Sequence, residues 1–435
     1  NVFCILFVIV LNYSLCFCFC DLFFLCFFVD FCFFYVVLWY CFFMFFCFLF
    51  VVFLIVRRCF SFLLFFFTLW GFVYILFVVL FVLLLEDFVC FIVLFEGLFF
   101  PIVFVLVFFS FSVRFMFALL NFVVFSSFSS VLVIFLGFLF IVHFNVFSFL
   151  MLWDFCFFDS VCYGVFLWFF VFIVFALKYP IWPLHSWLPE VHVEASTELS
   201  VLLASCILKI GFFGFLKFLV LSFFLFTLVL MLLLECFILC GLFMLFVILC
   251  FIVDYKKLIA HWSVVHISLG INFLWHCDLL FLGLVIFCNM FHIVSSSFMF
   301  FLLGMLFDVY GLRCFLFLYA FFGLSLWSFL MVICVCFNID FPFLLMFFVD
   351  VFLYMSVLCF SFCFLFVFVC LSCFVWLSSL YVLVCLCFFS FIWLDVFLRF
   401  DLSFNDVVFF YVLFMVCCYF VLYMYVLFFV LCVFM

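Results

Sequence analysis

The chain has 435 residues, of which 79% are hydrophobic and only 7% charged, and its mean hydropathy is +1.92. So apolar a sequence cannot divide into a buried core and a polar shell facing water, which excludes a soluble globular protein. The net charge of −9 is spread thinly and indicates neither a nucleic-acid-binding surface nor a basic lipid-binding patch. We therefore expect a multi-pass membrane protein whose surroundings are phospholipids, without a nucleic-acid partner.

Long apolar runs predict the fold class. Residues 31–56 and 59–85 are each long enough for a helix to cross a bilayer, which takes about 20 residues. The short alternating segments of a membrane β-barrel do not appear, so an all-α polytopic protein is predicted. No Pro/Ser-rich linker or charge run marks a boundary, and residues 1–435 are interpreted as one transmembrane domain.

The composition also carries a bias that belongs to the gene. Phe occurs 103 times and Cys 30 times, whereas Gln is absent; the favoured residues have codons rich in U or G. Such a bias is typical of an organelle genome, and residues 1–20 show no Arg and no amphipathic presequence. We interpret the scattered Cys as small apolar residues, although Cys370 and Cys373 make the CxxC spacing once.

Four ionisable residues lie within apolar sequence, in the order Glu96, Lys178, Lys209 and Asp350. A charge at the bilayer centre costs about 2.5–3.5 kcal/mol, so it persists where something compensates it. Glu96 and Lys178 can compensate each other as an ion pair, whereas Lys209 and Asp350 have no opposite charge close in sequence. The alternative is a boundary position for each: a snorkelling lysine, an interfacial acid or a loop residue.

The prolines indicate interrupted helices. Pro180 and Pro183 follow Lys178, and Pro342 precedes Asp350. A proline inside a helix cannot donate to the carbonyl four residues earlier, so Pro180 would free that of Ala176. Non-helical backbone at membrane depth requires packing in protein or a wet cavity, and transporters build ion sites from such broken helices. Discontinuous helices are therefore predicted near Lys178 and Asp350.

Polar residues gather in the middle of the chain. His185 and His192 stand among Glu190, Glu194 and Glu198, a grouping open to interpretation as a metal cluster; we favour a water-exposed re-entrant segment capped by these residues. The pair at 256 and 257, both Lys, follows Asp254 and is interpreted as a solvated helix end. His266 and His292 are either satisfied core histidines or part of a polar path.

These residues resemble a known family. The segment 178–195, KYPIWPLHSWLPEVHVEA, and the following LKIGFFG at 208–214 resemble the central signature of the antiporter-like membrane subunits of respiratory complex I. The stretches DYKKLIAHWSVVH at 254–266 and HIVSSS at 292–297 are similar to later parts of the same family. The resemblance covers about residues 85–355. Within the family, the subunit 4 branch has an acid at the distal end of its charged axis, where Asp350 stands.

The resemblance implies about 13 transmembrane helices, in line with the length needed for each crossing. It also implies a proton-translocating site in which Glu96 pairs with Lys178 and Lys209 is the central proton carrier. His266 and His292 then lead onward through water to Asp350 on the exit side. Three features depart from the family: Asp350 stands in place of the usual Glu, Glu190 and Ser196 replace Lys and Pro, and Glu96 comes early in the chain.

The implied function is proton pumping as a membrane-arm subunit of NADH:ubiquinone oxidoreductase in the mitochondrial inner membrane. The chain shows no dinucleotide-binding glycine motif and no iron–sulfur cysteine cluster, so no cofactor of its own is expected. NADH, FMN, iron–sulfur clusters and ubiquinone would belong to partner subunits, and neighbouring antiporter-like subunits would be partners. Two alternatives remain open: a cation/proton antiporter subunit outside any respiratory enzyme, and a structural subunit whose pump has decayed.

Overall fold

The computed structural model describes residues 62–85, 87–109, 113–144, 161–222, 228–274, 279–311 and 325–338. All of them lie in one compact unit, Phe43–Met435. Every regular element in these ranges is a helix, which confirms the predicted all-α class for this part of the chain. The expected helix count of about 13 and the single-domain interpretation stay predictions, and Asp350 lies outside the described residues.

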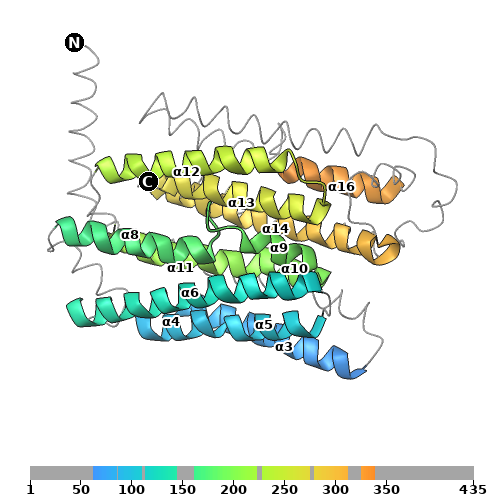
Figure 1. The fold of residues 1–435 in the computed structure, drawn as a ribbon, viewed down its shortest axis with the longest axis horizontal. Coiled ribbons are helices and arrows are strands. Elements are labelled where there is room, and N and C mark those ends of the chain that lie inside the picture. The colour runs from blue at the N-terminus through green and yellow to red at the C-terminus, as the bar shows by residue number, and fades with distance from the viewer. Residues whose placement is uncertain are drawn as a thin grey trace, which may run out of the picture. The chain divides into compact units, whose positions relative to one another are not determined.

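Thirteen named helical segments follow one another along the described ranges (Figure 1). They are α3 (Phe62–Leu84), α4 (Phe88–Gly97), α5 (Phe99–Phe109), α6 (Val113–Phe144), α8 (Val161–Lys178), α9 (Trp187–Glu194), α10 (Thr197–Leu202), the π-helix η1 (Leu203–Ile207), α11 (Leu208–Ser222), α12 (Leu228–Leu249), α13 (Tyr255–Leu274), α14 (Leu279–Tyr310) and α16 (Ser325–Asn338). Helices α4 and α5 belong to one apolar stretch, and α10, η1 and α11 belong to another. The number of helical segments is therefore not the number of membrane crossings.

Four stretches in the described ranges are long and apolar enough to cross a membrane: Phe88–Val107, Val113–Val142, Thr197–Phe218 and Val285–Met305. The first two bury 39% and 33% of their residues inside the protein, whereas the last two each bury 94%. Large side chains such as Phe117, Phe128 and Phe138 on α6 are exposed, as expected where lipid is the solvent. The two enclosed stretches carry Lys209, Asn289 and His292, whereas Glu96 lies in the first stretch.

The helix packing brings distant parts of the chain together around those enclosed stretches. Helix α13 packs against α14, α12 and α9, and α14 also contacts α10 and η1. Helix α11 packs against α8, while α6 covers α8 and α9 (Figure 1). As a result, polar side chains from α4, α8, α11, α13 and α14 can meet inside the protein.

The helix that carries Lys178 ends at that residue, as the prolines predict. Pro180 frees the carbonyl of Ala176 from its ordinary helical partner, and the amide N–H of Ile181 donates to it instead at 3.2 Å. The indole N–H of Trp187 donates to the carbonyl of Leu177 at 3.1 Å. The break therefore leaves these two carbonyls satisfied, which is what makes it tolerable away from water.

A second irregularity precedes Lys209. The π-helix η1 covers Leu203–Ile207 between α10 and α11. Five residues of one continuous apolar stretch are therefore π-helical, not α-helical. Single π-turns inside α-helices occur frequently at functional sites. Here the π-helix ends at Ile207, and α11 begins at the next residue, Leu208. Lys209 is thus the second residue of α11, and its side chain is buried.

Candidate functional site

Glu96 and Lys178 form an ion pair between α4 and α8. Nζ of Lys178 donates to Oε2 of Glu96 at 3.1 Å, and the side chains are 15% and 16% exposed. The ammonium also lies 5.1 Å from the ring centroid of Phe95, within the range of a cation–π contact. The other carboxylate oxygen of Glu96 is buried and has no hydrogen-bond partner among the described residues. Among the described residues, the pair is thus held through one oxygen of the carboxylate, while the other oxygen is buried without a partner.

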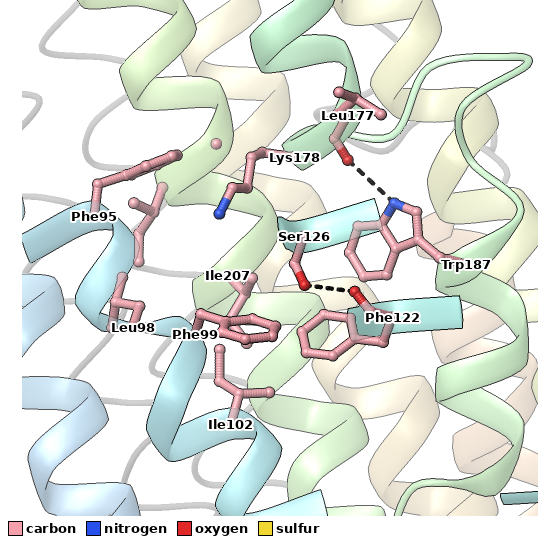
Figure 2. A pocket seen from close by; sticks show the side chains of 12 residues that line it. Phe95, Leu98, Phe99, Ile102, Phe122, Ser126, Leu177, Lys178, Trp187 and Ile207 are labelled. Carbon is pink, nitrogen blue, oxygen red and sulfur yellow. Dashed lines mark hydrogen bonds between the residues drawn. The ribbon is translucent and has the colours of Figure 1, made fainter. Parts of the chain in front are cut away.

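A cavity of about 40 Å³ lies beside Lys178. Figure 2 shows the ammonium of Lys178 directed into it between Phe95 and Ser126, with Trp187 at the far wall. A buried water requires about 10–15 Å³ measured this way, so the cavity has room for about three water molecules. Most of its lining is apolar, however, and Ser126 already donates to the carbonyl of Phe122. The lysine is therefore the main polar group that faces this space.

Lys209 on α11 is fully buried and faces α14. Its Nζ lies 3.1 Å from Nδ1 of His292 and 3.3 Å from Oδ1 of Asn289. An ammonium has no lone pair, so protonated Lys209 donates both bonds, and Nδ1 of His292 must then be an acceptor. Neither partner is an acid. The structure thus places a buried cation between two groups that carry no negative charge.

His266 continues this group on α13. The ring centroids of His266 and His292 are 5.5 Å apart and the rings are tilted by 51°. Lys209, His292 and His266, three of the predicted site residues, therefore lie together, while Glu96 and Lys178 form a separate pair. The predicted exit residue, Asp350, and the predicted helix break beside it fall outside the described residues.

The two histidines after the helix break were predicted to face water, and this prediction is wrong. His185 is 7% exposed and His192 is fully buried, with its ring stacked on Phe300 at 4.6 Å. Burial lowers the pKa of His185 to about 4, helped by the nearby His261, and lowers that of His192 to about 3, helped by Lys256. Both are therefore neutral at pH 7. In the described part of the chain, no three His, Cys, Asp or Glu side chains are grouped to hold a metal ion.

Lys256 was predicted to lie at a solvated helix end, and this too is wrong. Its side chain is 5% exposed, and its Nζ donates to the carbonyl of Ala195 at 2.7 Å, just after α9. The sequence correctly places Lys256 and Lys257 at the start of a helix, α13. Hydropathy cannot show that α9 packs against α13, which buries Lys256. Its neighbour Lys257 is only partly buried, in line with the expectation.

Two residues with no predicted role join the site. Asn289 lies one helical turn before His292 on α14, and the hydroxyl of Tyr179 donates to its Oδ1 at 2.7 Å. Tyr179 directly follows Lys178. The spacing of three residues between Asn289 and His292, within an apolar run, is the sequence signal that could have identified this asparagine, because residues three apart share a helix face. Through Asn289, the turn after Lys178 and the Lys209 group are connected by hydrogen bonds.

Buried polar side chains inside long apolar helices define this chain as an α-helical membrane protein with polar groups enclosed in its interior. A model of the family described as NADH:quinone oxidoreductase/Mrp antiporter, transmembrane region, matches residues 85–375. The chain belongs to that family.

Individual relatives match shorter segments. NADH-ubiquinone oxidoreductase chain 4 of Acanthamoeba castellanii is 37% identical over 154 residues, which is 34% of this chain and 30% of that protein. Chain 4 of Arabidopsis thaliana is 34% identical over 160 residues, with the same two shares. NADH-quinone oxidoreductase subunit M of Rickettsia conorii is 55% identical over 51 residues, 12% of this chain and 10% of that protein. The chain therefore aligns with less than a third of the length of these curated relatives.

Solved structures share the fold. The membrane-bound sulfane sulfur reductase, an archaeal respiratory membrane complex, contains a chain with a TM-score of 0.70 and 12% identity, covering 82% of this chain and 73% of that one. The Mrp complex from a Dietzia species gives a TM-score of 0.62 at 16% identity, covering 72% and 59%. At such identities the similarity concerns the fold alone.

Proposed function

We infer that the chain is an antiporter-like subunit 4 of a respiratory NADH:ubiquinone oxidoreductase and that it moves protons across the mitochondrial inner membrane. Family membership and the similarity to mitochondrial chain 4 proteins support the assignment to this enzyme class. NADH oxidation, FMN, iron–sulfur clusters and quinone reduction are assigned to partner subunits. Other membrane-arm subunits, including neighbouring antiporter-like ones, are the proposed partners.

The observation that carries the proposal is the environment of Lys209. Within the described ranges, this fully buried lysine of a membrane-spanning stretch is held by an amide oxygen and an imidazole nitrogen, and by no carboxylate. A lysine without an acidic partner changes readily between its charged and neutral forms in a poorly solvated site. A lysine that served only to stabilise the fold would be expected to have a carboxylate, because an unpaired buried charge is costly.

Proton release follows from the charges around this lysine. When the Glu96–Lys178 pair separates, an uncompensated positive charge remains near Lys209. Like charges in a poorly screened interior repel each other, so this charge lowers the proton affinity of Lys209. Nδ1 of His292 lies within hydrogen-bond distance and receives the proton, and the adjacent His266 leads it onward. Asp350 is proposed as the acid on the exit side.

The energy source distinguishes this function from that of an independent cation/proton antiporter. The enzyme that contains the chain would be reconstituted into liposomes, and the internal pH followed under two conditions: NADH with quinone and no sodium gradient, or a sodium gradient without NADH. The proposal predicts proton movement only in the first condition. Proton movement driven by the sodium gradient alone would favour the antiporter and contradict the respiratory assignment.

A further inference from the structure

One oxygen, Oδ1 of Asn289, accepts hydrogen bonds from two different parts of the chain. The hydroxyl of Tyr179 donates to it at 2.7 Å and Nζ of Lys209 at 3.3 Å. Tyr179 and Lys209 are fully buried and Asn289 is 5% exposed. Nδ2 of Asn289 donates to the carbonyl of Val285 at 3.1 Å, which fixes the amide with its oxygen toward the two donors. The arrangement is therefore set by contacts on both sides of the amide.

The two donors do not share this oxygen equally. A hydroxyl donor at 2.7 Å is at the usual distance for such a bond, whereas 3.3 Å is long for a charged N–H donor, which normally approaches to about 2.7–2.9 Å. The hydroxyl therefore holds the oxygen more closely and leaves Lys209 with a weakened bond. Lys209 is closer to the His292 nitrogen, at 3.1 Å, than to the amide.

Tyr179 is also packed tightly against the helix of Lys209. A methyl group on Gly211, two residues beyond Lys209, would lie 3.2 Å from the backbone nitrogen of Tyr179 and 3.3 Å from the carbonyl carbon of Lys178. The absence of a side chain at Gly211 allows this close approach. The ring of Tyr179 lies 5.4 Å from that of Phe212 on the same helix. Because Tyr179 directly follows Lys178, a displacement of the turn at Lys178 would also displace the tyrosine whose hydroxyl donates to Asn289.

We propose that Tyr179 and Asn289 are positioning residues that couple the Glu96–Lys178 pair to Lys209, through competition of the Tyr179 hydroxyl and the Lys209 ammonium for one amide oxygen. The proposal deepens the proposed function and rests on it for its role in proton transfer. When the turn after α8 holds the hydroxyl on Asn289, the bond to Lys209 is weak and its proton is released more readily. When the hydroxyl withdraws, the amide oxygen binds the ammonium more closely and the proton is retained.

The competition predicts opposite effects from two substitutions. Tyr179→Phe removes the competing donor and should strengthen the hold on protonated Lys209. Asn289→Leu removes the acceptor and should weaken it. A variant that merely disturbs packing has no reason to act in opposite directions at these two positions. Titratable groups near Lys209 in the described ranges include Lys178 at the end of α8, Tyr179 just after it and His292 on α14, with His266 on α13 beyond His292.

The test is the titration of Lys209 in the full-length chain in lipid bilayers, followed by ¹⁵N NMR of labelled lysine side chains. The chain has only five lysines, and the signal that Lys209→Met removes identifies Lys209. Tyr179→Phe should move its midpoint to higher pH and Asn289→Leu to lower pH, each by about half to one pH unit, which is a threefold to tenfold change in proton affinity. Tyr74→Phe, at an exposed tyrosine, and Asn272→Leu, at a buried asparagine of α13, are the matched controls and should leave the midpoint unchanged.

Shifts in the same direction, or no shift, would overturn the competition. The coupling is tested separately with Glu96→Gln, which should displace the Lys209 midpoint less in the Tyr179→Phe background than in the unmodified chain. An equal displacement in both backgrounds would overturn the coupling role of Tyr179. The NMR titration does not depend on proton pumping, so it gives the same information if Lys209→Met leaves pumping intact and the proposed function fails.

Discussion

Nζ of Lys209 lies 3.1 Å from Nδ1 of His292, and the ring of His292 lies 5.5 Å from that of His266. An imidazole can accept a proton at one nitrogen and release one from the other, so His292 can pass on the proton that Lys209 gives up. This contact joins α11 to α14, and the two residues are 83 positions apart in the sequence.

Replacement of His292 should therefore lower the rate of proton translocation strongly and the thermal midpoint only slightly. His292→Phe removes the acceptor and is expected to reduce the translocation rate by about a hundredfold or more, in line with the usual contribution of one acid–base group. His292→Gln keeps an acceptor oxygen for Lys209 but cannot relay a proton, and should be equally slow while its thermal midpoint stays closer to that of the unmodified protein. Proton uptake by liposomes and thermal unfolding would be compared, and a fast glutamine variant would contradict the relay.

The Glu96–Lys178 pair should show strong coupling in stability. Glu96→Gln leaves Lys178 without its acid, and Lys178→Met leaves Glu96 without its base, and each single change is expected to cost about 3 kcal/mol of unfolding free energy. The double variant removes both charges and should come within about 1 kcal/mol of the original protein. Unfolding in detergent would measure the cycle, and additive losses would show that the two side chains do not depend on each other.

Acidification should destabilise the segment after α8. The pKa of His185 is lowered from 6.5 to about 4 and that of His192 from 6.5 to about 3, so the unfolded chain binds more protons than the native protein between these values. Above about pH 6.5 both histidines are neutral in the native and the unfolded chain, and they do not reduce the free energy of unfolding. Below it, the free energy of unfolding falls by up to about 1.4 kcal/mol per pH unit for each histidine.

Thermal midpoints measured from pH 7.5 to 5 should thus decrease, and His192→Leu should make the decrease less steep. The leucine keeps an apolar contact for Phe300 but cannot be protonated. A pH dependence that is the same in the variant would show that His192 does not titrate as proposed.

The contact between α10 and α14 requires the glycine at 304. A methyl group there would lie 2.0 Å from Cγ2 and 2.5 Å from Cβ of Thr197, so Gly304→Ala must push the helices apart and should cost about 1–3 kcal/mol. The loss should be smaller in a Thr197→Gly background, where both overlapping atoms are gone. Gly97→Ala, where no atom lies within 4 Å, is the control and should be nearly neutral. Equal losses at positions 304 and 97 would contradict this packing.

The sequence predicted the helical class and the helix break at Lys178, because apolar length and proline chemistry act locally. The Glu96–Lys178 contact joins residues 82 positions apart; charge compensation and the family resemblance indicated it, but spacing alone could not. The burial of His185, His192 and Lys256 was predicted wrongly because a polar residue in a short segment is assigned to water unless the covering helix is known. Asn289 was missed because a lone amide in an apolar run carries no charge that demands a partner.

If Lys209 carries the proton, its replacement must lower the number of protons that the enzyme moves. The enzyme containing Lys209→Met would be reconstituted into liposomes, and protons moved per NADH oxidised would be compared with the unmodified enzyme and with Lys217→Met. Lys217 is eight residues further along α11, where it donates to the carbonyl of Leu85 and contacts Phe91 and Phe213. We expect fewer protons per NADH in Lys209→Met and an unchanged ratio in Lys217→Met. An unchanged ratio in Lys209→Met, in a fully assembled enzyme, would contradict this role of Lys209.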